Sequence, residues 1–407
     1  MRWLILALFF GTTILNQIDR QTLSILAPTI QADLGVSTIQ YSFVVQSFLV
    51  FYALGMFLAG PVTDRLGAKR AIMLFLGFWS VAQMATGAVR SFLQLCAARA
   101  GLALGEAGNY VAAPKAVSDW FPPAERGVAV GIYTSAGMLG AVMAPPLIAW
   151  SALEHGWRTT FFWTGLAGLL WIVPILAFYG RPPNVVNEQV VATEDSPEIR
   201  AGLGPLVRSP VVWRLFAARL LTDPVWYFYL FWFAKYLQDT RGFTLSDVGR
   251  WGWSTYAAAD VGSILGGVAS GWLIKRGMDA LPARLRVMSL VAVLAPIGLV
   301  LALHPPIWLT MTVAALVAFL HLAWLTNLAA LMVDFFPGRI LGRAIGLVGA
   351  GSAIGGALSS PVIGYLITYH SYDAVFVFLG LLHPLGWFAL RPLGAKRKVG
   401  TRAMAGV

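Results

Sequence analysis

The sequence predicts an all-α polytopic membrane protein with twelve transmembrane helices in two duplicated six-helix halves. Three observations lead to this fold class: the apolar composition, the spacing of the apolar segments and an internal repeat. The chain of 407 residues is 58% hydrophobic and only 12% charged, whereas soluble domains are typically about 25% charged. Its single cysteine, Cys96, excludes an internal disulfide framework, and the spacing of its five histidines argues against a metal centre.

The predicted spans follow from the length that a bilayer demands, which is about 20 mostly apolar residues per helix. The first apolar run continues past Asp19 and Arg20 to Pro28 without a cleavage site, so we interpret it as a span and not as a signal peptide. The one long polar interval, 181–210, is the predicted cytoplasmic linker between an N-terminal six-helix bundle (1–180) and a C-terminal bundle with a cytoplasmic tail (211–407). The twelve predicted spans lie near 3–30, 40–63, 71–89, 91–118, 127–150, 158–179, 211–238, 248–274, 286–303, 307–335, 343–367 and 373–390.

The distribution of Lys and Arg predicts the orientation of the chain. With the N-terminus inside, twenty of these residues fall in inside loops and ends, and only Arg90, Arg158, Arg241 and Arg250 fall in outside loops. Because cytoplasmic loops are enriched in Lys and Arg, both termini and the linker are predicted to be cytoplasmic. The short loops favour a bacterial inner membrane. The net charge of +11 is therefore a topology signal, and its spread over separate loops argues against nucleic-acid binding.

An internal duplication links the two halves. Residues 119–150 align without gaps to residues 334–365, with nine identities in 32 positions, and both copies begin with Asp-aromatic-Phe-Pro. Glycine-rich membrane helices can look alike by composition alone, but the shared start argues against that explanation. Such repeats are typical of secondary transporters, whose substrate sites lie near the bilayer midplane between the repeats.

The first inside loop carries a dense motif. Residues 60–70 read Gly-Pro-Val-Thr-Asp-Arg-Leu-Gly-Ala-Lys-Arg, and residues 271–276 echo it without the acid. The motif resembles the loop 2–3 signature of the major facilitator superfamily, G-x-x-x-D-R-x-G-x-[KR]-R, and implies the major facilitator fold. We expect its charges to bridge the halves on the cytoplasmic side and to separate when that side opens; the alternative is membrane anchoring with a turn at Gly67. The gating residues predicted in this way are Asp64, Arg65, Lys69 and Arg70.

Further runs are similar to one branch of that superfamily. Residues 16–37 and 99–126 look like the anion:cation symporter family, and residues 223–267 and 321–337 are similar to its hexuronate-transporter subgroup. The resemblance covers about residues 1–390. It implies a monomeric transporter for a small organic anion, a hexuronate or related sugar acid, coupled to protons.

Several ionisable residues lie deep in the predicted spans. A charge at the bilayer centre costs at least about 2.5–3.5 kcal/mol, so such residues face a cavity or a partner. Arg20, about 16 residues into the first span, is the predicted ligand of the substrate carboxylate, because a guanidinium stays charged and binds carboxylates in a bidentate way. The alternative is a structural ion pair. In the family that the chain resembles, the arginine at this position is a substrate ligand.

Asp19 and Glu106 are the candidate proton carriers. Burial disfavours the charged form of a carboxyl group and a nearby arginine favours it, so an acid under both influences can titrate during a transport cycle. Static ion pairing is the alternative for each acid. Both acids match proton-coupling positions of the family that the chain resembles.

Uncharged groups are expected to bind the hydroxyls of the substrate. Tyr52 matches a family binding position, and Asn109 follows Glu106 by three residues and shares its helix face. His321, Trp324 and Asn327 recur every three residues, and an indole face with amide and imidazole donors suits a sugar acid. Packing in the membrane is the alternative for each aromatic. Related galactonate carriers have a glutamine where this chain has Gly137, which argues against galactonate itself.

The predicted function is proton-coupled symport of this sugar acid by alternating access. The alternative is an organic-anion exchanger or exporter of the same fold without obligatory proton coupling, which would tolerate Glu106→Gln. An embedded enzyme is not expected, because the sequence contains no catalytic triad, metal-ligand spacing or phosphate-binding loop. No cofactor beyond the coupling proton is predicted, and the expected partners are the sugar acid, protons and lipid. The roles of Asp223, Lys235 and Asp260 stay open.

Overall fold

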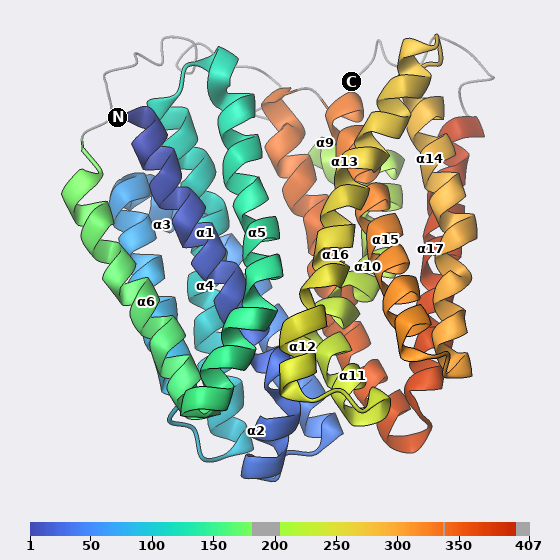
Figure 1. Cartoon of the computed structure of the whole chain (residues 1–407). Coiled ribbons are helices and arrows are strands. Elements are labelled where there is room, and N and C mark those ends of the chain that lie inside the picture. Colours follow the sequence, from blue (N-terminus) through green and yellow to red (C-terminus); the bar gives the residue numbers. More distant parts are fainter. Residues whose placement is uncertain (181–203, 337, 396–407) are drawn as a thin grey trace. The chain divides into compact units, whose positions relative to one another are not determined.

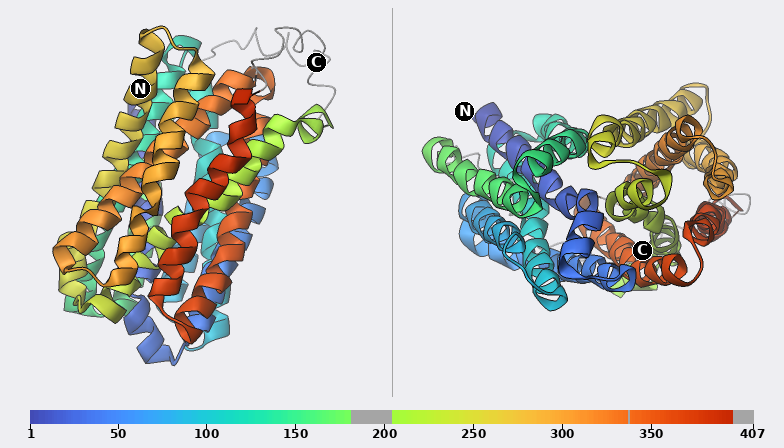
Figure 2. Two further views of the ribbon diagram at one scale, coloured as in Figure 1. Left: turned by 90° about the vertical axis from the view of Figure 1, so that its right-hand side faces the viewer. Right: turned by 60° about the horizontal axis from the view of Figure 1, so that its bottom comes forward.

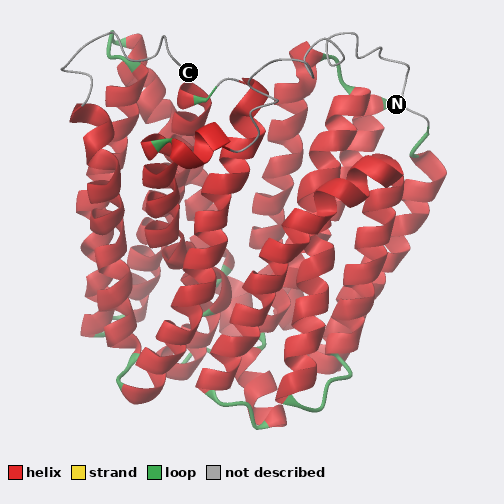
Figure 3. Cartoon of the chain, turned by 180° about the vertical axis from the view of Figure 1, so that it is seen from behind, coloured by secondary structure: helices red, strands yellow, loops and turns green. Residues whose placement is uncertain are grey.

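The computed structural model describes residues 1–180, 204–336 and 338–395 (Figure 1). Within these ranges the chain is helical, with short loops and no strand (Figure 3). The predicted all-α class is therefore confirmed. Ten of the twelve predicted apolar segments each coincide with a described helix or with two consecutive helices, and the other two, 40–63 and 71–89, both lie in the helix Thr38–Thr86.

The described residues form two compact units. Unit 1 holds residues 1–180, 228–257 and 357–369, and unit 2 holds residues 204–227, 258–356 and 370–395. The helices that lie wholly in unit 1 are α1 (Arg2–Ile25), α2 (Ala27–Leu34), α3 (Thr38–Thr86), α4 (Phe92–Trp120), α5 (Pro123–His155), α6 (Trp157–Phe178), α11 (Phe233–Arg241) and α12 (Leu245–Trp251). Those of unit 2 are α9 (Gly204–Arg208), α14 (Ala280–Leu294), the 3₁₀ helix η1 (Ala295–Leu303), α15 (Ile307–Phe335) and α17 (Tyr372–Ala395). Three helices contribute to both units: α10 (Pro210–Phe231), α13 (Trp253–Lys275) and α16 (Gly338–Tyr369).

Helix length and composition agree with a polytopic membrane protein. Eight described segments are long and apolar enough to cross a membrane. One of them, α3, is broken at Gly67, whose φ of 72° and ψ of 160° lie outside the helical region, and a positive φ favours glycine. The remaining helices of 20 or more residues are α1, α4 and α10, and these carry the buried charges Asp19, Arg99, Glu106 and Asp223. The count of twelve spans stays a prediction.

The repeat predicted from sequence recurs in the helix boundaries. Helices α4 and α15 both have 29 residues, and their first residues, Phe92 and Ile307, are 215 positions apart, the same offset as in the sequence alignment. Their C-caps are Phe121 (φ −112°, ψ 135°) and Phe336 (φ −114°, ψ 127°). The offset also relates the starts of α5 and α16 and the starts of α6 and α17. The structure therefore extends the duplication beyond the residues that align.

The first helices of the two halves share a pattern that the sequence alignment does not reveal. Helix α1 is separated from α2 by the single residue Leu26, and α10 is separated from α11 by the single residue Trp232. Both short helices end at a glycine in the left-handed conformation, Gly35 (φ 64°) and Gly242 (φ 70°). Each glycine is followed by a capping box, formed by Ser37 with Gln40 and by Thr244 with Asp247.

Ion pairs define the two ends of unit 1. At one end Arg2 of α1 pairs with Glu125 of α5 at 2.9 Å. At the other end Arg158 of α6 pairs with Asp33 of α2 at 2.9 Å and donates to the carbonyl oxygens of Gly87 and Val89. The N-terminus and the loop around Phe121 thus share the end that the charge distribution assigns to the cytoplasm. Orientation in the membrane stays a prediction.

Unit 2 has its own apolar core. Buried residues of α9, α10, α14, α15, α16 and α17 form it, and Trp324 and Met288 within it are fully buried. Helix α17 packs along α14 and η1 (Figure 2). Glycines allow close packing of α13 on α15, because a Cβ at Gly266 would lie 2.6 Å from the Cα of Ala323.

Candidate functional site

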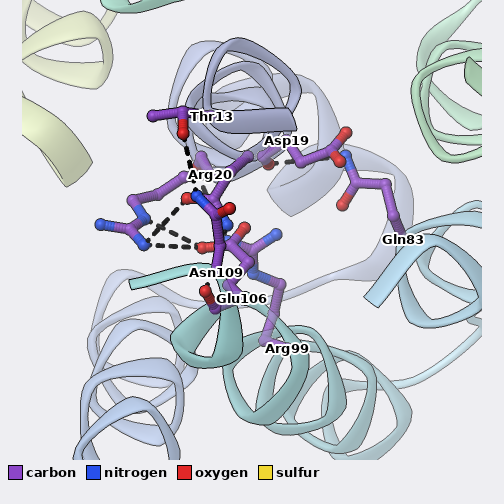
Figure 4. A network of polar contacts seen from close by, with 8 residues as sticks. Thr13, Asp19, Arg20, Gln83, Arg99, Glu106 and Asn109 are labelled. Carbon is purple, nitrogen blue, oxygen red and sulfur yellow. Dashed lines mark hydrogen bonds and ion pairs between the residues drawn. The ribbon is translucent and has the colours of Figure 1, made fainter. Parts of the chain in front are cut away.

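The centre of the candidate site is an ion pair between two helices of unit 1. The guanidinium of Arg20 (α1) lies 2.9 Å from Oε2 of Glu106 (α4), through both Nη2 and Nε (Figure 4). The Glu106 side chain is fully buried and that of Arg20 is 16% exposed. Asn16, one turn before Arg20, accepts from its Nη2 at 3.4 Å and donates to the Glu106 carbonyl oxygen at 3.3 Å. The pair is therefore fixed from both helices.

Two aromatic rings of α3 hold the arginines. The Cζ of Arg20 lies 4.7 Å from the ring centroid of Tyr52 and 5.4 Å from that of Phe48. Phe48 also contacts Arg99, whose Cζ lies 5.1 Å from its centroid. Guanidinium groups are attracted to aromatic faces, most strongly where water is excluded. Tyr52, a predicted substrate ligand, thus lies against Arg20, the residue predicted to bind the substrate carboxylate.

Arg99 and Asp19 are buried beside this pair but are weakly bonded. Arg99 is fully buried, and it donates a hydrogen bond from Nη2 to the carbonyl oxygen of Arg20 at 3.4 Å. Its Nε and Nη1 have no hydrogen-bond partner among the described residues, and the same holds for both carboxyl oxygens of Asp19. In Figure 4 the Asp19 carboxyl points toward Gln83, away from the Arg20 guanidinium. A buried carboxylate without hydrogen bonds is costly, and the role of Asp19 as a proton carrier stays a prediction.

Small residues allow α4 to bring Glu106 to this position. A Cβ at Gly105 would lie 2.6 Å from Cβ of Trp79, so α4 approaches α3 more closely than a larger residue would permit. One turn along α4, Asn109 donates from Nδ2 to Oγ1 of Thr13 at 3.1 Å, while its buried Oδ1 has no partner among the described residues. Gly137 leaves open space near Thr13, because a Cβ there would meet only the Thr13 methyl group, at 3.8 Å.

The structure thus brings together five of the predicted site residues: Asp19, Arg20, Tyr52, Glu106 and Asn109. Their roles as ligands and proton carriers remain predictions. Sequence reasoning missed Asn16 and Thr13, although the i, i+4 spacing of Asn16 and Arg20 was a usable signal. It also missed Gln83, which donates to the Asp19 carbonyl oxygen at 3.4 Å and to Thr164 at 3.0 Å.

The other three predicted ligands lie in unit 2, where all are fully buried. His321 Nδ1 lies 3.2 Å from Nε2 of His383, and its ring stacks on Trp226 at 5.9 Å. Trp324 packs edge-on against His383 within the apolar core. Asn327 donates from Nδ2 to the carbonyl oxygens of Gly266 and Ala323, which joins α15 to α13. Their binding roles remain predictions, and the partner His383 was not predicted.

Two residues whose roles the sequence leaves open, Asp223 and Lys235, form ion pairs. Arg219 Nε lies 2.7 Å from Oδ2 of Asp223 on α10, and Lys235 Nζ lies 2.7 Å from Oδ2 of Asp239 on α11. In both pairs the residues are four apart on one helix, so they face each other. Asp260 on α13 has no hydrogen bond or ion pair with any described residue.

The predicted gating residues lie at the α3 break. Asp64, Arg65 and Arg70 are exposed. Lys69 donates to the carbonyl oxygens of Tyr179 (2.5 Å) and Leu176 (3.4 Å) at the end of α6, where a cation also suits the helix dipole. Lys69 therefore ties the α3 break to α6, and the gating roles of all four residues stay predictions.

Comparison with characterised proteins gives transporters of sugar acids and related anions. The chain is 29% identical over 399 residues to a hexuronate transporter of Escherichia coli (strain K12), covering 95% of this chain and 92% of the relative. It is 30% identical over 281 residues to a galacturonate transporter of Dickeya chrysanthemi, covering 66% of this chain and 81% of the relative. It is 32% identical over 392 residues to a probable sulfoacetate transporter of Cupriavidus necator, covering 91% and 89%.

Solved structures show the same fold. A bacterial homologue of the human lysosomal transporter Spinster, in an inward-facing and unoccupied conformation, superposes with a TM-score of 0.82 at 21% identity, over 99% of both chains. A D-xylose-proton symporter superposes with a TM-score of 0.74 at 16% identity, over 95% of this chain and 96% of that one. The family model of the Major Facilitator Superfamily matches residues 9–320 and 278–405. The chain therefore belongs to the major facilitator superfamily of membrane transporters.

Proposed function

We propose that the protein is a secondary active transporter that carries a hexuronate or related sugar acid together with protons by alternating access. The observation that carries the proposal is the buried Arg20–Glu106 pair, 2.9 Å apart. In this pair, Arg20 is a group that can bind the substrate carboxylate, and Glu106 is a titratable acid that competes with the substrate for Arg20. The names of the relatives, which include hexuronate and galacturonate transporters, support the substrate class.

Exchange at Arg20 provides a mechanism for coupling. The substrate carboxylate and Glu106 need the same guanidinium, and a charge-assisted bond is lost when one displaces the other. Protonation of Glu106 removes its negative charge, so the substrate carboxylate then becomes the preferred partner of Arg20. Because linkage is reciprocal, substrate binding in turn favours proton uptake by Glu106.

The charges of the buried cluster indicate how a second proton, bound by Asp19, would affect the substrate. With Arg20, Arg99, Asp19 and Glu106 all ionised, the cluster is neutral. Each proton taken up by an acid adds one positive charge near the anion site, which attracts the substrate. The Asp19 carboxyl points toward Gln83 and not toward the Arg20 guanidinium (Figure 4). We therefore assign to Asp19 a role through charge and not through direct contact with the substrate.

The contacts within unit 1 support an outer gate that is closed in this conformation. Tyr41 donates to the Phe231 carbonyl oxygen at 2.6 Å, and Ser360 donates to the Ser42 carbonyl oxygen at 3.0 Å. Gln238 donates to the Ile25 carbonyl oxygen at 3.1 Å. These bonds join the first two spans to segments of the C-terminal half. Opening toward the outside requires that they break.

The remaining parts of the proposal concern topology. We propose two six-helix bundles, 1–180 and 211–407, joined by a cytoplasmic linker at 181–210 in a bacterial inner membrane, with both termini inside. Asp64, Arg65, Lys69 and Arg70 then lie on the cytoplasmic side. There they are placed to hold that side closed when the outer side opens.

Uptake of labelled galacturonate and glucuronate into proteoliposomes, with and without an inward proton gradient, tests the proposal. We expect gradient-driven accumulation by the parent and its loss in Arg20→Ala and Glu106→Gln. The matched controls are Arg90→Ala and Glu154→Gln, which change exposed residues of the same types. Uptake that ignores the gradient favours the exchanger, and uptake that survives Arg20→Ala contradicts the binding role of this arginine.

A further inference from the structure

The carboxyl group of Asp19 is buried among helices of unit 1 and does not point toward the guanidinium of Arg20. It points toward Gln83 on α3 (Figure 4). Gln83 is fully buried and joins α1 to α6, because it donates to the Asp19 carbonyl oxygen at 3.4 Å and to the Thr164 hydroxyl at 3.0 Å. The Asp19 carboxyl group thus belongs to a polar layer that α1, α3 and α6 form together, which we call the first layer.

The first layer contains buried polar atoms that the described residues do not satisfy. Both carboxyl oxygens of Asp19, Oε1 of Gln83 and Nε1 of Trp79 have no hydrogen-bond partner among the described residues. Trp79 and Thr164 lie close to the Asp19 carboxyl, but outside hydrogen-bond geometry. Buried donors and acceptors are normally bonded either to protein or to ordered water, and a buried water molecule typically bonds to about three such groups. The set of donors and acceptors around Asp19 is therefore suited to bound water.

A second polar layer lies one turn further along the same three helices. Its members are Thr22, Thr86 and Thr160, which are all fully buried. Each of them is three or four residues from the first-layer residue of its own helix and therefore lies on the same helix face. Helices α1 and α3 end, and α6 begins, at the end of unit 1 that carries the Arg158–Asp33 pair. The second layer thus lies between Asp19 and this end, which the predicted topology places outside.

The second layer continues to the outer end of unit 1. The Thr160 hydroxyl lies 3.0 Å from Oγ of Ser151 on α5, and Ser151 is half-buried next to the exposed turn 153–156. In the other direction, four residues of α6 separate Thr160 from Thr164, which corresponds to about 6 Å along the helix. One water molecule with two hydrogen bonds of about 2.8 Å bridges such a gap. Hydroxyl groups and water can therefore connect the Asp19 carboxyl to the outer end.

The same three helices are apolar on the other side of Asp19. A small void there is lined mainly by apolar residues, namely Leu8, Phe9, Ile72 and Ile175. Thr12 also borders this void, seven residues before Asp19, and its hydroxyl donates to the carbonyl oxygen of Leu8 at 2.8 Å. Hydroxyl groups in membrane helices can serve packing alone, and Thr12 represents that case. The polar layers around Asp19 thus continue toward the outer end only.

We propose that Asp19 receives its proton from the outside through these two polar layers, along a route within unit 1 that is separate from the substrate path. The inference rests on the proposed function and adds the route of one coupling proton. A proton from outside water adds to the Asp19 carboxylate, while each water or hydroxyl of the route accepts one proton, passes one on and is left unchanged. The charged groups that act on this carboxyl, Glu106 and Arg99, both lie on α4. Once Asp19 is neutral it no longer offsets Arg99, so the anion site becomes more positive.

Removal of one hydroxyl group from the second layer tests the route. Thr160→Val keeps the shape of the side chain without its hydroxyl, whereas Thr160→Ser keeps the hydroxyl. We expect Thr160→Val to slow gradient-driven accumulation of galacturonate in proteoliposomes about tenfold or more, because a positioned proton-transfer group typically contributes about 10²- to 10⁴-fold in rate. Thr160→Ser should accumulate galacturonate like the parent. If Thr160→Val fails to fold, Thr86→Val is the substitute.

Counterflow separates proton movement from the rest of the transport cycle. Vesicles loaded with unlabelled galacturonate exchange it for labelled galacturonate without net proton movement, so Thr160→Val should keep the parent rate in this assay. The matched control is Thr12→Val, which removes a fully buried hydroxyl from the apolar side of Asp19. We expect Thr12→Val to match the parent in both assays.

The outcomes separate this inference from the proposed function. Accumulation by Thr160→Val at the parent rate overturns the route and leaves proton-coupled transport standing. Equal slowing of accumulation and counterflow overturns it as well, because the hydroxyl then supports the structure and not proton movement. The same conclusion follows if Thr12→Val slows accumulation as much as Thr160→Val does. A parent whose uptake ignores the proton gradient overturns the proposed proton coupling together with the route.

Discussion

Replacing Glu106 by glutamine tests the competition at Arg20. The change keeps the size of the side chain but removes the carboxylate that lies 2.9 Å from the guanidinium. A hydrogen bond to a charged group contributes roughly 1.5–3 kcal/mol, which is the free energy that a substrate must replace to displace Glu106. Without this competitor, binding of galacturonate at neutral to alkaline pH is expected to tighten about 10- to 150-fold.

The pH dependence gives the sharper readout. In the parent, substrate binding is accompanied by proton uptake at Glu106, so affinity is greatest at low pH and falls as pH rises. In Glu106→Gln this dependence is reduced, because one of the two proposed proton sites is gone. Calorimetric titration of purified protein with galacturonate between about pH 5 and pH 8 measures both effects. Parent-like affinity with a parent-like pH slope would refute the competition.

Two further predictions concern other parts of the molecule. In a Cys96→Ser background, Ser42→Cys and Ser360→Cys together are expected to form a disulfide on oxidation, because the Ser360 hydroxyl bonds to the Ser42 carbonyl oxygen at 3.0 Å. The cross-linked protein should not transport until reductant is added. Unchanged transport by fully cross-linked protein would contradict the proposed outer gate. His383→Ala leaves His321 buried without its partner, and an unpaired buried polar group costs about 1–3 kcal/mol. Thermal unfolding in detergent should therefore shift downward, and an unshifted transition would show that the histidine pair adds no stability.

Much of the fold follows from local physical chemistry. Hydropathy alone located the helices, because each must present about 20 apolar residues to lipid. The glycine of the loop motif marked the α3 break, since Gly67 adopts a positive φ. The breaks at Leu26 and Trp232 were missed, because neither residue is a helix breaker and only the pattern of the two halves together reveals them.

The sequence predicted five residues of the cluster around Arg20 and Glu106 but not how they pair. Arg20 and Glu106 are 86 positions apart, and no periodicity relates residues on different helices. For Asn327 the sequence suggested a role that its hydrogen bonds in the structure do not require. Its position on α15 suggested a ligand, but its Nδ2 donates to two backbone carbonyl oxygens, one of them on α13. Such a contact depends on how closely Gly266 allows α13 to approach α15. The spacing of residues in the sequence does not reveal that distance.

Proton movement driven by the substrate is the most direct test of the central claim. A pH-sensitive dye trapped in proteoliposomes reports the pH of the lumen when galacturonate is added outside, with no imposed gradient. We predict that the lumen acidifies with the parent and that Arg20→Ala gives no signal. Galacturonate that enters the vesicles without acidifying the lumen would contradict proton coupling through the Arg20–Glu106 pair.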